Sequence, residues 1–141
     1  MGRNRNSWYV HAQWIIKDYQ KNKKELEAIT ADYAYAHSQL AEERVQCSNI
    51  SGGAVDVVLK MEKDERRNTL LRDIAAVDYG LAMQGLYEDG DIRIAYITAR
   101  YWSGMYTPDG AAASVHISPP TGQRINQQFV KDVAKKAGYL V

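Results

Sequence analysis

Glutamine, arginine and lysine side chains recur at helical spacing between residues 121 and 135. Apolar residues lie four apart in the same segment, so a helix ending near residue 137 should bury one face and expose the other. Those apolar positions are Ile125, Phe129, Val133 and Ala137. On the exposed side, glutamine can bond N6 and N7 of adenine, arginine can bond O6 and N7 of guanine, and lysine can neutralise phosphate. The chemistry that these residue types offer is the reading of double-stranded DNA.

The candidate contacts follow from position along this helix, because residues near the start of a recognition helix reach deepest into the major groove. The residues expected to bind base edges or nearby phosphates are Thr121, Gln123, Arg124 and Gln127, with Gln128 on the same polar face. Lys131 and Lys135 are expected to bind phosphates. The competing interpretation is an ordinary solvated helix face.

A short helix is predicted directly before the long one. Thr107-Pro108-Asp109 can begin it, with threonine as N-cap, proline at the first helical position and an acid near the positive end of the helix dipole. The short helix must end before Ser118, because two prolines follow. We expect Pro120 to begin the long helix, with Pro119 held outside it.

A third helix is predicted from Asp91 to Trp102, ended by Gly104. Together with the short helix, a tight turn and the long helix, it predicts a helix-turn-helix. Two positions depart from the usual pattern of this motif. His116 stands in the turn where glycine is common, and Gly122 stands where a buried isoleucine or valine is expected.

The N-terminal part carries a heptad pattern, in which every third or fourth residue belongs to one seam. Its members are Trp8, Ala12, Ile15, Tyr19, Asn22, Leu26, Ile29, Tyr33, Ala36 and Leu40. With no proline or glycine between residues 7 and 44, one long helix is predicted over this range. The seam can pair within the chain as an antiparallel hairpin or between chains as a coiled coil, and periodicity does not separate the two.

A glycine-containing loop is predicted at residues 47–53, followed by a second helical region that begins near Glu62. Gly80 and Gly85 should weaken the end of that region, and a turn is predicted at residues 87–90. The fold class that follows is all-α. Residues 1–90 are predicted to form a helical hairpin or coiled-coil interaction region, and residues 91–141 a helix-turn-helix DNA-binding domain.

Length and composition agree with this organisation. A chain of 141 residues, 45% of them hydrophobic, can bury an ordinary core. The net charge of +1 is unevenly distributed: residues 91–141 hold six Lys/Arg against three Asp/Glu, whereas residues 45–90 hold five against eight. A basic segment beside an acidic one suits local attraction to phosphate.

Other chemistries find no support in the residue pattern. The three histidines, His11, His37 and His116, are far apart and lack cysteine or glutamate at ligand spacing, so no metal site is predicted. There is no phosphate-binding glycine loop and no Ser-His-Asp arrangement, so we predict neither a cofactor nor an enzyme.

The expected location is the cytoplasm, because the single cysteine, Cys47, cannot close an intramolecular disulfide and no secretory leader is evident. No run approaches the ~18 apolar residues that span a bilayer, so no membrane association is predicted.

The C-terminal segment resembles the ArpU/RinA-type phage late-transcription regulators. The residues that carry the resemblance are Arg100-Tyr101-Trp102, Thr107, Ala111-Ala112, Ile117-Ser118, Thr121, Arg124 and Ala137-Gly138-Tyr139-Leu140. That region of the family is similar to the sigma-factor domain that reads the upstream promoter element. The resemblance implies a phage-encoded activator that binds a late promoter and recruits host RNA polymerase.

Two other functions fit the same pattern. A small-terminase-like protein would bind a packaging site on DNA and assemble into a ring. A helical adaptor or assembly protein without a nucleic-acid role would rest on the heptads alone. A homo-oligomer formed through the N-terminal helices is compatible with each of the three functions.

Overall fold

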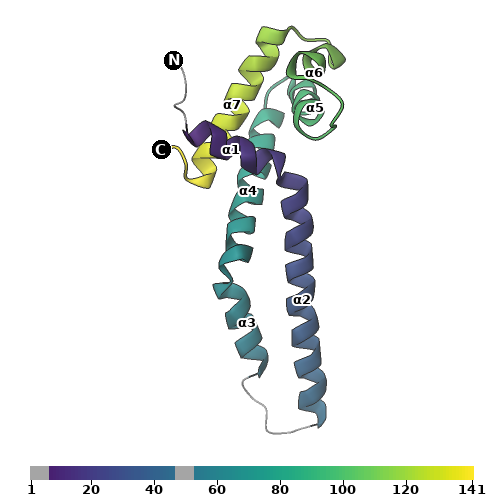
Figure 1. Ribbon diagram of the computed structural model, residues 1–141, viewed down its shortest axis with the longest axis vertical. Coiled ribbons are helices and arrows are strands. Elements are labelled where there is room, and N and C mark those ends of the chain that lie inside the picture. Colours follow the sequence, from purple (N-terminus) through teal and green to yellow (C-terminus); the bar gives the residue numbers. More distant parts are fainter. Residues whose placement is uncertain (1–6, 47–52) are drawn as a thin grey trace. The chain divides into compact units, whose positions relative to one another are not determined.

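The computed structural model describes residues 7–46 and 53–141. Within these ranges the chain forms seven helices and no strand (Figure 1). The all-α prediction is therefore confirmed.

Packing divides the chain into two compact units. The first unit joins residues 7–20 to residues 73–141, and the second comprises residues 21–72. The prediction divided the chain at residue 90, whereas the packing groups the first helix and the end of the fourth with the C-terminal helices.

The N-terminal helix is interrupted, so the prediction of one helix over residues 7–44 is wrong. α1 spans Ser7–Lys17 and α2 spans Tyr19–Gln46, with a turn at Asp18. The indole Nε1 of Trp102 donates to the backbone carbonyl of Ile16 at 2.8 Å. In an uninterrupted helix that carbonyl would accept from the amide four residues later. A tertiary hydrogen bond therefore reaches the backbone two residues before the turn at Asp18.

The first unit has a continuous apolar core. α1 packs against α7 (Pro119–Ala137), and α5 (Gly90–Tyr101) and α6 (Pro108–Ser114) pack against each other and against α7 (Figure 1). The fully buried side chains include Ile16, Val77, Tyr96, Ile97, Ala111, Ala112, Phe129, Val130 and Val133. The end of α4 (Glu65–Gly85) joins this core at Gly80, where a Cβ atom would lie 2.7 Å from Cγ2 of Val133 and 2.9 Å from the Phe129 ring. Glycine at residue 80 thus permits close contact between α4 and α7.

A buried polar network ties α1, α5 and α7 together. Asn126, which is 0% exposed, donates to the hydroxyl of Tyr9 at 2.8 Å and accepts from the hydroxyl of Tyr101. Gln13 donates to the Tyr101 hydroxyl at 3.2 Å. Burial raises the pKa of Tyr101 to about 12. The amide of Asn126 has partners on both sides, as a buried polar group requires.

In the second unit, α2 runs antiparallel to α3 (Gly53–Lys63) and to the first turns of α4. The Tyr33 hydroxyl on α2 donates to Asp64 Oδ2 at 2.7 Å, and Arg66 at the start of α4 bonds both oxygens of Glu25 at 2.6 and 2.7 Å. The seam residues from Leu26 to Leu40 are half-buried. Ile29, Tyr33 and Ala36 line cavities that α3 or Asp64 also lines.

The second helical region begins earlier than expected. The sequence predicted a helix from about Glu62, but α3 already starts at Gly53 and ends at Lys63. Asp64 separates it from α4 and accepts from the backbone amide of Arg67 at 2.9 Å, as an N-cap does. The rest of the predicted loop, residues 47–52, lies outside the described residues.

Candidate nucleic-acid interface

The start of α6 is as the sequence predicts. Thr107 is the N-cap, its side chain accepts from the amide of Gly110 at 3.0 Å, and Pro108 occupies the first turn. The helix ends at Ser114 after seven residues. Gly104 has the predicted positive φ of 71°, although α5 already ends at Tyr101.

α7 begins one residue earlier than expected. Ser118 is the N-cap and its hydroxyl accepts from the amide of Thr121 at 3.3 Å, so Pro119 is helical and the prediction that it stays outside is wrong. Ser118 directly before Pro119 supplies an N-cap with an extended backbone, and proline is favoured in the first turn of a helix. α7 then runs to Ala137 and ends at Gly138, whose φ is 91°.

The two atypical positions between and within these helices have physical explanations. His116 adopts a φ of 63°, the left-handed conformation for which glycine is usual. Gly122 is buried, and a Cβ atom there would lie 2.8 Å from Cε1 of Tyr96. The ring of Tyr96, on α5, takes the space that a larger residue at 122 would fill.

α7 has one buried face and one cationic face. The buried residues are Gly122, Ile125, Asn126, Phe129, Val130, Val133, Ala134 and Ala137. The exposed residues are prolines, amides and cations: Pro119, Pro120, Gln123, Arg124, Gln127, Gln128, Lys131, Lys135 and Lys136. Asp132 is the single carboxylate of the helix; it is half-buried, and burial raises its pKa. The exposed face of α7 therefore carries no carboxylate.

The structure brings the seven candidate residues together on α7. Arg124, Gln128, Lys131 and Lys135 are spaced four, three and four apart, which places them along one stripe opposite the buried face. Gln123 and Gln127 are exposed beside it. Thr121 is half-buried: its hydroxyl shares a 2.9 Å hydrogen bond with Ser118 and accepts from Arg124 Nη2 at 3.3 Å.

Two arginines of α5 were not among the candidate contacts, although Arg100 belongs to the residues that carry the family resemblance. Arg93 donates to Gln128 Oε1 at 2.9 Å and forms an ion pair with Asp89 at 2.8 Å, a bond that lowers the pKa of Asp89. Arg100 donates to the Tyr96 hydroxyl at 3.0 Å and lies over the Tyr101 ring, 5.4 Å from its centroid. The only sequence signal for Arg93 is the excess of basic residues after residue 91, because its partners Gln84 and Gln128 lie on other helices.

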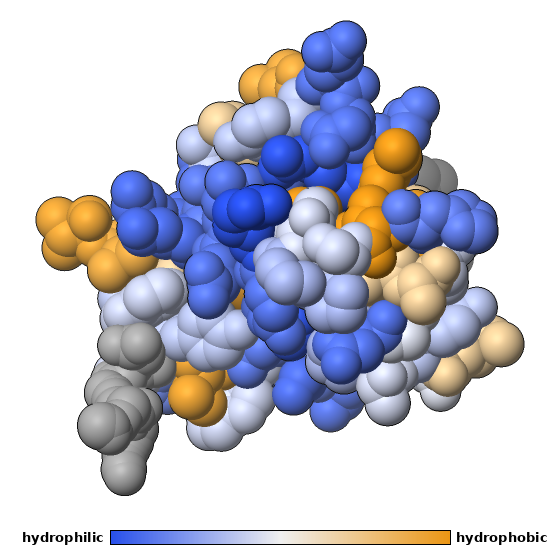
Figure 2. All heavy atoms as spheres, turned by 90° about the horizontal axis from the view of Figure 1, so that it is seen from above, coloured by the Kyte–Doolittle hydropathy of each residue, from blue (hydrophilic) through white to orange (hydrophobic). Residues whose placement is uncertain are grey.

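The space-filling view shows a mostly hydrophilic face with apolar side chains in small, separate groups (Figure 2). Over the described residues, no three or more His, Cys, Asp or Glu side chains are grouped as metal ligands would be. In the same part of the chain, no helix combines the length and apolar character needed to cross a bilayer.

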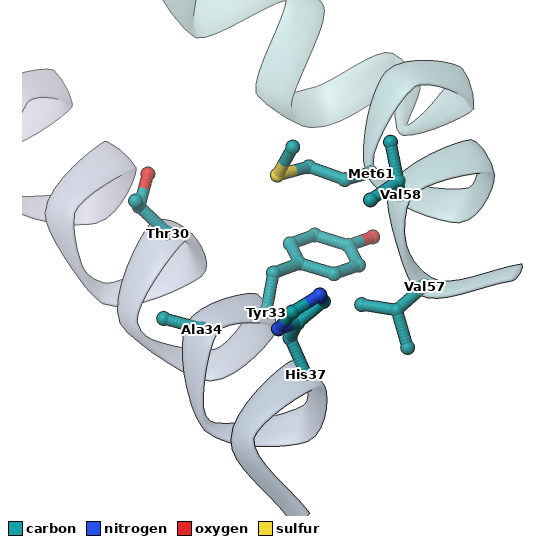
Figure 3. A pocket seen from close by; sticks show the side chains of 7 residues that line it. All are labelled: Thr30, Tyr33, Ala34, His37, Val57, Val58 and Met61. Carbon is teal, nitrogen blue, oxygen red and sulfur yellow. The ribbon is translucent and has the colours of Figure 1, made fainter. Parts of the chain in front are cut away.

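The second unit holds a half-open cavity of about 280 Å³ between α2 and α3 (Figure 3). The rings of Tyr33 and His37 face the apolar side chains of α3 there. The lining residues are Thr30, Tyr33, Ala34, His37, Val57, Val58 and Met61. Since this lining contains no carboxylate and no cysteine, it offers no acid–base pair and no metal-ligand set.

No protein-family model, curated protein or solved structure matches the chain.

Proposed function

We propose that this protein binds double-stranded DNA sequence-specifically, with α6, the turn and α7 acting as a helix-turn-helix and α7 entering the major groove. The observation that carries the proposal is the exposed face of α7, which consists of prolines, amides and cations without a carboxylate. An ordinary solvated helix face mixes both signs of charge, whereas a face for DNA needs donors for base edges and cations for phosphates.

The roles of individual residues follow from their order along α7. Arg124 is exposed within the second turn and has no carboxylate partner among the described residues, so it is free to grip guanine O6 and N7. Gln123 and Gln127 flank it as further base or phosphate contacts. Lys131 and Lys135 follow toward the C-terminal end and neutralise phosphates. Thr121 positions Arg124 through its hydroxyl.

A regulatory role is the part of the proposal that rests on resemblance. The likeness to phage late-transcription regulators favours a promoter as the DNA site, host RNA polymerase as the recruited partner and a non-catalytic activator as the class. Exposed apolar residues of α3, among them Val55 and Leu59, favour a homo-oligomer formed through the N-terminal helices.

The proposal is tested by selecting duplexes from a random pool with the full-length chain and measuring affinity for the best and for scrambled sequences. Arg124→Ala should lose about 1–3 kcal/mol of binding to the selected duplex and little to scrambled DNA. Arg66→Ala, which removes an arginine from the second unit, is the matched control and should bind as the wild type does. Equal affinity of the wild-type chain for every duplex would refute sequence-specific binding.

A further inference from the structure

Arg93 connects three helices around one guanidinium. Its Nη1 donates to Oε1 of Gln84 on α4 at 3.0 Å and to Oε1 of Gln128 on α7 at 2.9 Å. Its Nε bonds Asp89, and the group lies 3.8 Å from the centroid of the Tyr87 ring. The side chain is only 16% exposed. The guanidinium is thus held in place from several directions.

This arrangement fixes which end of the Gln128 amide faces Arg93. A guanidinium has five donors and no acceptor, so the atom that bonds it must be the carbonyl oxygen. Gln84 shows the same orientation: its Oε1 faces Arg93, and its Nε2 is buried without a hydrogen-bond partner among the described residues. The NH₂ group of Gln128 is consequently the end left for the exposed stripe of α7.

We infer that Arg93 makes Gln128 a donor-only contact to DNA, a specificity that rests on the proposed function. To pair with adenine in two hydrogen bonds, glutamine must donate to N7 and accept from N6. In Gln128 the accepting oxygen is bonded to a charged donor, which disfavours a second donor such as the adenine amino group. Guanine presents two acceptors, O6 and N7, and thymine presents O4. Adenine offers a donor-only contact a single acceptor, N7, beside its N6 donor, so Gln128 prefers guanine over adenine at one base pair.

The test measures base preference at every position of the selected duplex. Wild type should discriminate against adenine at one base pair, and Arg93→Met should reduce that discrimination by roughly tenfold while other positions keep theirs. In a Gln128→Ala background, Arg93→Met should cause no further change at that base pair. This double-mutant cycle separates an effect through Gln128 from a general effect on the fold.

Arg66→Met is the matched control, since it makes the same substitution at an arginine bonded to Glu25, and base preference should be unchanged. Gln128→Glu provides a second route if Arg93→Met does not fold. It keeps an acceptor for Arg93 but removes both N–H donors, so the preference at the same base pair should be lost while the melting temperature is kept.

Two results would overturn the inference. One is an unchanged base preference in Arg93→Met. The other is a Gln128→Ala variant whose affinity falls by the same factor for every duplex, as loss of a phosphate contact would cause. A wild-type chain without any sequence preference would instead refute the proposed function, so the two failures are distinguishable.

Discussion

The two units are built from the same kind of helix but are stabilised differently. In the first unit Phe129 and Ile16 are fully buried, and Asn126 is satisfied by tyrosine hydroxyls inside the core. In the second unit the apolar seam is half-buried, and its interhelical hydrogen bonds, Arg66 to Glu25 and Tyr33 to Asp64, lie nearer the surface. Apolar periodicity predicts a helix in both, but it does not report how deeply that helix is buried.

The heptad seam itself is divided between the units. Ala12, Ile15 and Tyr19 are buried in the first unit, whereas Leu26 and Ile29 are half-buried in the second. The candidate DNA-binding face lies on the unit with the dense core, so its side chains project from a helix fixed by packing.

The largest difference in stability between the two units should come from truncating one apolar side chain in each. Phe129→Ala removes a fully buried ring and should destabilise the first unit by about 3–5 kcal/mol. Leu26→Ala removes a half-buried side chain and should cost only about 1 kcal/mol. Urea unfolding followed by far-UV circular dichroism reports the helices of both units, and tryptophan fluorescence isolates the first unit because Trp8, Trp14 and Trp102 all lie there. Similar losses for both variants would contradict the difference between the units.

A smaller effect is expected from adding one methyl group at the contact between α5 and α7. Gly122→Ala places a Cβ atom 2.8 Å from Tyr96 and should destabilise the first unit by about 1–3 kcal/mol. Gly85→Ala is the control: its Cβ atom would meet only Ile94, at 3.4 Å, and alanine is the better helix former, so stability should rise by less than about 1 kcal/mol. Thermal unfolding of both variants measures the contrast, and a stabilised Gly122→Ala would show that the ring can move aside.

The smallest effect is the pH dependence of the stability of each unit. It is visible only at extremes of pH. Burial raises the pKa of Tyr101 to about 12, and burial with the Asp78 hydrogen bond raises that of Tyr19 to about 12. Unfolding returns each pKa to 10.0, so their stabilising contribution is complete below pH 10 and is lost as the pH rises toward 12.

In the second unit the pH dependence of stability has the opposite sign. Backbone hydrogen bonding lowers the pKa of Asp64 below 3.8, and the Arg66 hydrogen bond lowers that of Glu25 below 4.5. Their contribution is present above those values and is lost as the pH falls through the lowered pKa of each group.

For the first unit, the melting temperature measured by tryptophan fluorescence should fall between pH 10 and 12. A fluorescence midpoint unchanged over that range would contradict the assignment to Tyr101 and Tyr19.

The local features of the C-terminal region could be predicted because neighbours in the sequence cause them. Thr107 and Pro108 begin α6 through a cap and a fixed φ, and the spacing from Ile125 to Ala137 places the buried face of α7 correctly. The start of α7 was missed by one residue because Ser118, rather than Pro119, supplies the cap.

The features that could not be predicted depend on residues far apart in the chain. The turn at Asp18 coincides with a hydrogen bond from Trp102, and the glycine at 122 accommodates the ring of Tyr96. The early start of α3 at Gly53 was also missed, since glycine is a weak helix former.

The sequence by itself determined the all-helical class, the N-cap of α6 and the polar face of α7, because hydrogen bonds within a few residues and the period of 3.6 control them. Only the tertiary structure decided that α1 packs on α7 and that Arg93 holds the carbonyl oxygen of Gln128. These contacts join residues that no local spacing relates, and their energy comes from burial and directional bonding between helices.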